Sequence, residues 1–138
     1  MNRLRLVYLI FIISMLSVVA TSLFYSFFII DSVIEKEMKL IIGDHPGFDA
    51  GTDTITFGMI TKDGSCRRDI TLSNKKNYII NVKIQKSGNI SSFVLISDDD
   101  FVLNPGEEKK VYFTASSTPE TEYGEYTGTA IFILKRML

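Results

Sequence analysis

The stretch Tyr-Ile-Ile-Asn-Val-Lys-Ile, residues 78–84, places apolar side chains at every second position and decides the fold class. A period of two is typical of a β-strand that has one buried face and one face in water. The same alternation recurs along the chain in residues 54–59, 69–73 and 110–115. These four stretches predict antiparallel strands.

Three further strands are expected in the same part of the chain. Residues 93–96 and 130–134 are apolar on both faces, which predicts central strands, or for 130–134 a strand near a membrane or a partner. Residues 37–42 supply the remaining strand. Turn residues separate these stretches, most sharply in the type II turn pattern of Asn104-Pro105-Gly106-Glu107. The sequence therefore predicts an all-β fold, a seven-stranded immunoglobulin-like sandwich.

Residues 6–30 contain no charged side chain and are mostly apolar. As a helix, with about 1.5 Å of rise per residue, this stretch exceeds the roughly 30 Å hydrocarbon core of a bilayer. It predicts one N-terminal transmembrane α-helix. A secretory signal cleaved near Ala20 is the alternative, but signal cores usually span only about 7 to 15 residues. We therefore expect the helix to be retained as a signal-anchor.

The charges that flank this stretch indicate its orientation. Arg3 and Arg5 precede it, and Asp31 and Glu35 are the first charges after it. The positive-inside preference places residues 1–5 in the cytoplasm. Residues 31–36 are then expected as a tether, and residues 37–138 as an extracytoplasmic sandwich. The predicted location is the cell membrane, with a single pass.

Composition disfavours several classes of function. The chain has 138 residues, and its 15 Lys and Arg against 16 Asp and Glu give a net charge of −1. Without a basic surface we expect no nucleic acid partner. One Cys and one His are too few for the common catalytic pairs or a zinc site. We expect no enzyme activity, no catalytic residue, no cofactor, no metal and no small-molecule substrate.

Two acidic segments contain possible metal ligands, although a solvated loop is the favoured interpretation of each. His45 lies in a turn between Asp44 and Pro46, with Asp49 nearby. The run Asp98–Asp100 has carboxylate oxygens of the kind that Ca²⁺ prefers. Further ligands for that run would be Asp53 or Glu107.

A cysteine and a glycosylation motif are further candidate sites. Cys66 precedes Arg67 and Arg68, whose charges can activate a thiol, but an unpaired strand-edge residue is the favoured interpretation. Asn89-Ile90-Ser91 matches the acceptor pattern for N-glycosylation, so Asn89 is a possible modification site. The motif is short, and whether Asn89 is modified stays open.

Glycine and tyrosine positions complete the survey. We expect the glycines in the β region to lie at bulges and turns rather than in a phosphate-binding loop, since no glycine-rich loop opens a helix there. The glycines in question are Gly58, Gly106, Gly124 and Gly128. Tyr123 and Tyr126 form either a recognition patch or a packing contact on the last strand pair, and packing is the favoured interpretation.

The order of strands and turns resembles a known domain type. Its quoted segments are ITFGMITKDGSCRRDITLSN (55–74), YIINVKIQKSGNI (78–90), FVLNPGEEKKVYFTA (101–115) and YGEYTGTAIFIL (123–134). They resemble immunoglobulin-like domains of the major-sperm-protein and related ASH type, over residues 37–136. With the opening segment GDHPGFDAGTDTITFG (43–58), the layout is similar to short archaeal surface proteins with one membrane helix. The resemblance implies partner binding or assembly and transfers no catalytic residue.

The leading functional hypothesis is a single-pass cell-envelope protein. Its external immunoglobulin-like domain would make protein–protein contacts or assemble within a membrane or surface-layer complex, so the partners are the lipid bilayer and other proteins. The alternative is a filament subunit like pilins or archaellins, with the hydrophobic helix in the filament core. Pilin-type leaders usually place Gly or Ala before the cleavage point, whereas here Arg5 meets Leu6 directly.

Overall fold

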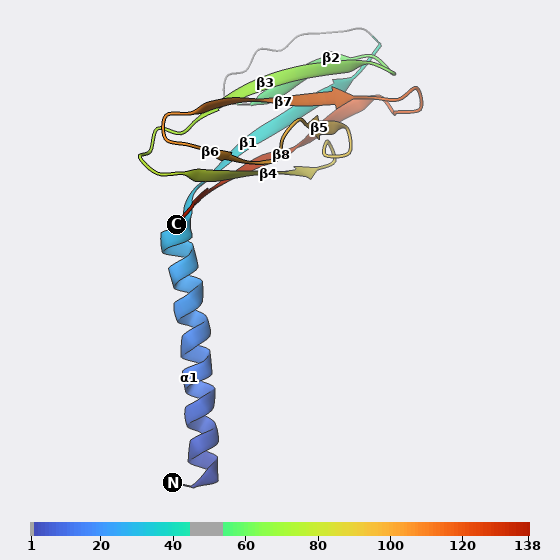
Figure 1. Cartoon of the computed structure of the whole chain (residues 1–138). Helices are drawn as coiled ribbons and strands as arrows, with labels where there is room; N and C mark the ends of the chain where they lie inside the picture. Colours follow the sequence, from blue (N-terminus) through green and yellow to red (C-terminus); the bar gives the residue numbers. More distant parts are fainter. Residues whose placement is uncertain (1, 45–53) are drawn as a thin grey trace.

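The computed structural model describes residues 2–44 and 54–138, and it has one helix joined to a β domain (Figure 1). The α-helix α1 (Arg3–Phe24) continues into a short π-helical segment, η1 (Tyr25–Ile29). None of the residues in α1 or η1 is buried, and the helix projects away from the domain. The expected N-terminal apolar helix is therefore present.

The described part of the domain contains eight strands in two sheets. The strands are β1 (Ile30–Ile42), β2 (Ile55–Ile60), β3 (Ser65–Ser73), β4 (Ile80–Gly88), β5 (Val94–Ile96), β6 (Asp100–Leu103), β7 (Glu108–Ser116) and β8 (Gly124–Arg136). One sheet has the order β2-β1-β8-β4-β6, and the other has the order β3-β7-β5. All pairs are antiparallel except β1 with β2.

The expected count of seven strands was wrong by one. The extra strand is β6, a four-residue edge strand that pairs with β4 and begins within the acidic run Asp98–Asp100. The two strands that are apolar on both faces have different positions. β8 is central in its sheet, as predicted, whereas β5 is an edge strand, and its Leu95 is 69% exposed. An apolar run on both faces therefore did not distinguish a central strand from an edge strand.

Residues 31–36 form a strand rather than a tether. β1 begins at Ile30, directly after η1, and pairs with β8 from Ile30↔Lys135 onward. Within this segment, Ser32 lies opposite Leu134 and Lys36 opposite Ala130. The backbone hydrogen bonds between β1 and β8 hold residues 31–36 in the sheet, although the sequence predicted a tether there.

The two sheets pack face to face around one hydrophobic core. Phe113 of β7 and Phe132 of β8 meet across the sheets with ring centroids 6.1 Å apart. Alternation explains the core, because inward side chains at every second position are removed from water while their neighbours remain outside. The largest fully buried apolar side chains are Phe57, Phe113, Phe132, Met38, Leu40, Ile42, Ile90, Leu103, Val82, Val94 and Val111.

Two expected glycine positions are confirmed. In the β1–β2 pair, Lys39 faces Thr56 and Leu40 faces Gly58, so the register skips Phe57 and Gly58 lies at a bulge with φ of 75°. At Gly106, φ is 78° and Glu107 N–H donates to Asn104 C=O over 3.0 Å, as the type II turn requires. Gly128 instead lies within the regular ladder of β8.

Candidate functional site

Two loops meet at the end of the domain away from the helix (Figure 1). We call residues 61–64 and 117–123 the distal tip. Ser117 is buried and joins them, because its Oγ donates to Thr61 C=O over 2.8 Å and accepts from Gly64 N–H over 3.2 Å. Ser117 N–H also donates to Gly64 C=O over 3.0 Å. The two loops are therefore held in one arrangement.

The longer loop of the distal tip is also fixed from within. Thr118 N–H donates to Thr121 Oγ1 over 2.9 Å, and Thr121 N–H donates to Thr118 C=O over 3.1 Å. At the start of β8, the Tyr126 hydroxyl donates to Glu122 C=O over 2.9 Å. A loop with this many internal hydrogen bonds loses little conformational entropy when it binds a partner.

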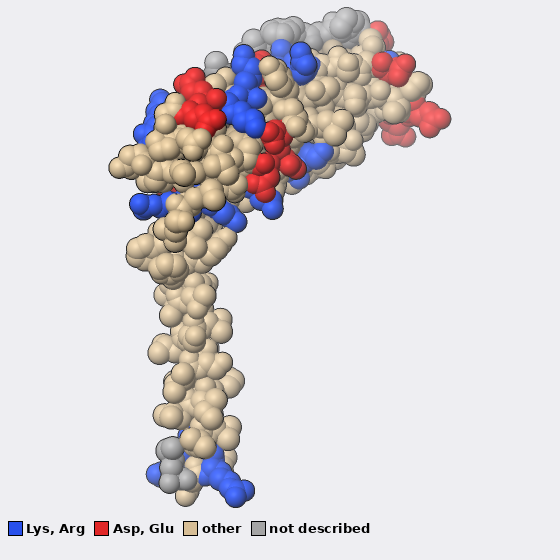
Figure 2. Space-filling view, viewed as in Figure 1, with Lys and Arg blue, Asp and Glu red and all other residues tan. Residues whose placement is uncertain are grey.

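Tyr123 is the most prominent side chain of the distal tip. It is 61% exposed, and Lys62 Nζ lies 4.6 Å from the centroid of its ring. Glu120 and Glu122 are also exposed, and Figure 2 shows acidic side chains gathered at this end of the domain. A fixed, exposed aromatic ring among charged side chains is a common centre of protein recognition.

The two candidate tyrosines have different roles. Tyr126 is half-buried, and its ring packs against Phe93 with centroids 4.5 Å apart. The packing interpretation therefore holds for Tyr126, whereas Tyr123 remains in water. Sequence reasoning treated the pair alike because both lie close together beside the last strand. It also missed Ser117, since a buried hydroxyl in a Ser/Thr-rich loop has no sequence signature.

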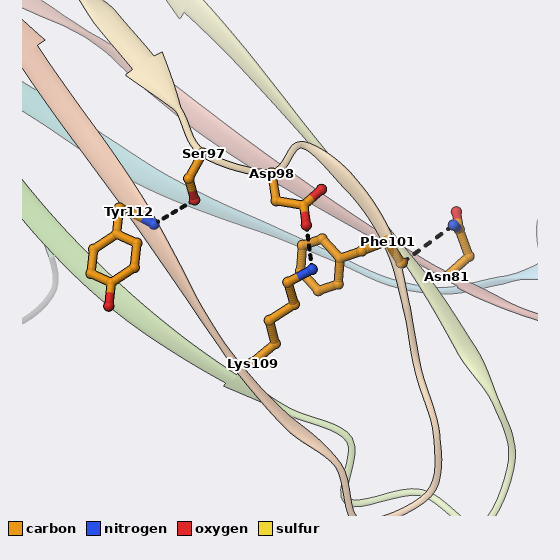
Figure 3. Close-up of polar contacts among 6 residues, drawn as sticks. All are labelled: Asn81, Ser97, Asp98, Phe101, Lys109 and Tyr112. Atoms are coloured by element: carbon orange, nitrogen blue, oxygen red, sulfur yellow. Dashed lines mark hydrogen bonds and ion pairs between the residues drawn. The ribbon is translucent and has the colours of Figure 1, made fainter.

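The acidic run between β5 and β6 is held by neighbouring side chains (Figure 3). The Asp98 carboxylate forms an ion pair with Lys109 Nζ, which also lies 4.4 Å from the Phe101 ring centroid. Asp100 Oδ1 accepts from Asn81 Nδ2 over 2.8 Å. The carboxylates of Asp98 and Asp100 are thus directed to different partners rather than to one shared cation.

Ser97, which precedes the run, and Asp99 within it each bind a strand of a different sheet. Ser97 Oγ accepts from Tyr112 N–H over 3.0 Å in β7, and Asp99 C=O accepts from Ile84 N–H over 2.7 Å in β4. Glu107 Oε2 accepts from Asn104 N–H within its own turn. Across residues 2–44 and 54–138, no three His, Cys, Asp or Glu side chains converge as metal ligands. His45, Asp49 and Asp53 lie outside the described residues.

Cys66 and Asn89 occupy different environments. Cys66 lies on the edge strand β3 opposite Ala115, where its half-buried side chain packs against the core. Asn89 is exposed in the β4–β5 loop, and its Oδ1 accepts from Thr127 N–H over 2.8 Å. Ser91 Oγ donates to Gly88 C=O over 2.7 Å. The acceptor motif is thus an exposed turn tied to β8, and its modification stays a prediction.

At the opposite end, the helix meets the domain in a compact neck. Met137 N–H donates to Ile79 C=O over 3.0 Å, which keeps the end of the chain beside the start of β4. Lys135 Nζ lies 5.5 Å from the ring centroid of Tyr25 in η1. The Arg136 guanidinium lies 4.3 Å from the ring centroid of Tyr78.

Tyr78 links β1 to the segment before β4. Its hydroxyl donates a hydrogen bond to Asp31 Oδ1. That hydrogen bond, with smaller contributions from burial and from the Asp31 charge, raises the pKa of the Tyr78 phenol, and Arg136 partly opposes the shift. The phenol therefore stays a neutral donor. Sequence analysis assigned Tyr78 to a strand and Asp31 to a tether, and so did not predict their contact.

A shallow groove crosses the outer face of β2, β1 and β8. It has a volume of about 600 Å³ and is lined by Glu37, Met38, Lys39, Thr54, Thr56, Glu125, Thr127, Gly128 and Thr129. Lys39 and Glu125 form an ion pair across it over 3.4 Å. Its side chains are mainly threonine hydroxyls and paired charges, which suit hydration better than acid–base chemistry.

Comparisons with protein-family models, with curated proteins and with solved structures find no match to this chain.

Proposed function

We propose that this chain is a single-pass membrane protein whose β domain lies outside the cytoplasm and binds another protein through the distal tip. The observation that carries the proposal is the uncovered apolar helix. The helical segment Arg3–Ile29 is long and apolar enough to cross a bilayer, and its apolar stretch is not buried against the domain. A lipid bilayer is the environment that removes such an apolar helix surface from water.

The charge distribution supports this orientation. Figure 2 shows a helix without acidic or basic side chains between its charged first turn and the neck. The first turn holds Arg3 and Arg5, whose positive charge favours the cytoplasmic side. The distal tip would then lie outside the cytoplasm at the end of the domain opposite the neck (Figure 1), where it can meet a partner.

Membrane anchoring and topology can be tested on the full chain in native membranes. We expect the protein to stay in the pellet after alkaline carbonate extraction and to keep its intact N-terminus, Met1. A tag after Leu138 should be cleaved by protease added outside intact cells. A soluble protein, a mature chain that begins after Ala20, or a protected C-terminal tag would contradict the proposal.

The distal tip can be tested with a photo-crosslinking amino acid in place of Tyr123. We expect one discrete adduct in intact cells. The matched control places the same amino acid at Leu95, which is 69% exposed but lies on the edge strand β5. Ser117→Ala should weaken the Tyr123 adduct by loosening the loop. Equal adducts at Tyr123 and Leu95 would count against a specific contact at the distal tip.

A filament subunit is the second candidate, because other copies of the helix can cover the same apolar surface. One face of the helix has a shallow hollow, which is lined by Ser17, Val18, Thr21, Ser22 and Tyr25. In that case most of the protein would be recovered in sheared extracellular filaments, with a processed N-terminus. An intact Met1 on a membrane-bound monomer excludes this candidate.

Kinship with immunoglobulin-like domains of the major-sperm-protein type is also a proposal. Two face-to-face sheets around one core, and the confirmed Asn104–Glu107 turn, support it. The described part of the domain also pairs β1 with β2 in parallel and contains eight strands. An experimental structure that superimposes on such domains strand by strand would establish it.

A further inference from the structure

The outer face of the five-stranded sheet carries an apolar stripe close to the neck. Ala130 and Phe132 of β8 are buried, so Ile131 and Ile133 point to the opposite, outer face. Val33 lies opposite Ile133 in the β1–β8 pair and is 51% exposed. Val33, Ile131 and Ile133 are therefore neighbours on the outside of the domain.

Strand geometry limits how far this stripe can lie from the helix. β1 starts directly after η1, and at about 3.3 Å per residue Val33 lies within roughly 13 Å of Ile29, the last residue of η1. In Figure 1 the strands β8 and β4 lie on the helix side of the domain, whereas β3 and β7 lie on the far side. The stripe thus borders the depth at which the apolar helix ends.

Basic side chains flank the stripe. Lys83 lies opposite Ile133 in the β4–β8 pair, and Lys135 lies opposite Asn81. Figure 2 shows basic side chains on both sides of the neck. Two acidic groups lie beside the stripe, Glu35 opposite Ile131 and Asp100 opposite Lys83. The Asp100 carboxylate accepts from Asn81, and that of Asp31 accepts from Tyr78.

We propose that this face, centred on Val33, Ile131 and Ile133 with Lys83 and Lys135 at its rim, docks on the anionic headgroup layer of the bilayer that the helix spans. The proposal rests on the membrane anchoring proposed above. Apolar side chains at the headgroup boundary with lysines at their edge match an interface of apolar chains and negative headgroups. Docking would set how far the helix and the domain tilt together against the bilayer, and with it the height of the distal tip.

The test uses the full chain with Cys66→Ala, in nanodiscs with one copy per disc. A spin label at Gln85→Cys reports on the proposed face, since Gln85 is exposed and lies opposite Ile131. A label at Thr71→Cys on the far sheet is the control. Lipids with a gadolinium-chelating headgroup provide the relaxation agent, in phosphatidylcholine with or without phosphatidylglycerol.

We expect strong relaxation of the Gln85 label in discs with phosphatidylglycerol, and none at Thr71. The double variant Lys83→Glu, Lys135→Glu should abolish most of this relaxation, and the milder Lys83→Gln should reduce it. Lys110→Glu on the far sheet should leave it unchanged. An unchanged circular dichroism spectrum ensures that each variant is folded.

The outcomes separate the two proposals. Loss of the protein from the bilayer on carbonate extraction would overturn anchoring itself. A retained protein with no relaxation at Gln85 would overturn docking alone. A Gln85 label that is shielded from water but not relaxed by the lipid would also overturn it, because another protein surface would then cover this face.

Discussion

At the scale of single residues, β4 and β8 approach each other closely where two glycines face each other. Gly88 of β4 lies opposite Gly128 of β8. A Cβ on Gly128 would lie 2.0 Å from Ser87 O and 2.6 Å from Ile90 Cγ2. Gly128→Ala must therefore push β4 and β8 apart, and we expect a loss of about 1–3 kcal/mol in the free energy of unfolding. Thermal unfolding of the β domain in detergent would measure it.

Gly106→Ala separates this steric effect from backbone strain. Gly106 has φ of 78°, but a Cβ there meets no atom within 4 Å. Its substitution should cost only the left-handed backbone conformation, on the order of 1 kcal/mol. If Gly106→Ala destabilises the domain as much as Gly128→Ala does, the close approach of β4 and β8 is not the cause.

Tyr78 gives a prediction about pH dependence. Its pKa is raised in the folded state, mainly because the hydroxyl donates to Asp31. The contribution to stability is therefore complete below about pH 10, the ordinary pKa of a phenol, and is lost as the pH rises through the folded pKa. In an absorbance titration one component should ionise above the ordinary phenol range, and Tyr78→Phe should abolish this late component.

Asp31→Asn is the matched variant for the same contact. It removes the carboxylate that accepts the hydrogen bond, so the late component should move toward the ordinary phenol range rather than disappear. An unchanged titration in Asp31→Asn would assign the shift to burial of Tyr78 and not to its partner.

The candidate residues show what sequence alone can and cannot reveal at this scale. The Asn104–Glu107 turn was predictable because proline and glycine constrain φ locally. The difference between Tyr123 and Tyr126 was not predictable, because it depends on the packing of Phe93 against the Tyr126 ring. The contact of Tyr78 with Asp31 joins residues far apart in sequence, and no local pattern encodes it.

At the scale of elements, alternation identified most strands but underestimated their lengths. β8 runs from Gly124 to Arg136 rather than over residues 130–134, and β1 runs from Ile30 rather than residue 37. The residues added to β1 and β8 pair with residues of the other strand. This pairing orders them even where apolar and polar side chains do not alternate. A strand start was expected at Phe101 after the acidic loop but was not counted among the seven, and β6 in fact begins at Asp100.

The β5–β6 connection yields a prediction about metal ions. Asp98 pairs with Lys109 and Asp100 with Asn81, so a calcium ion would have to displace both partners. We expect neither added Ca²⁺ nor a chelator to shift the melting temperature of the domain. Lys109→Met should lower stability by less than about 1 kcal/mol, because the Asp98 carboxylate is partly exposed. A calcium-dependent rise in melting temperature would contradict this assignment.

At the scale of the whole molecule, sequence reasoning separated an apolar helix from a β domain but not their connection. Charged and polar residues after Ile30 resembled a flexible link. In the structure, Ile30 N–H still donates to Tyr25 C=O while Ile30 already lies opposite Lys135. The last turn of the helix and the first pair of the sheet thus share a residue.

This shared residue predicts a rigid molecule. With spin labels at Leu23→Cys in α1 and Thr71→Cys in β3, on a Cys66→Ala background, we expect one narrow distance distribution in lipid. Inserting Gly-Ser-Gly between Ile29 and Ile30 should broaden it strongly, because such a linker behaves as a random coil. The same insertion between Pro119 and Glu120, in the distal tip, should leave it narrow. A broad distribution in the unmodified chain would show that the neck bends, and that β1 pairing does not orient the domain.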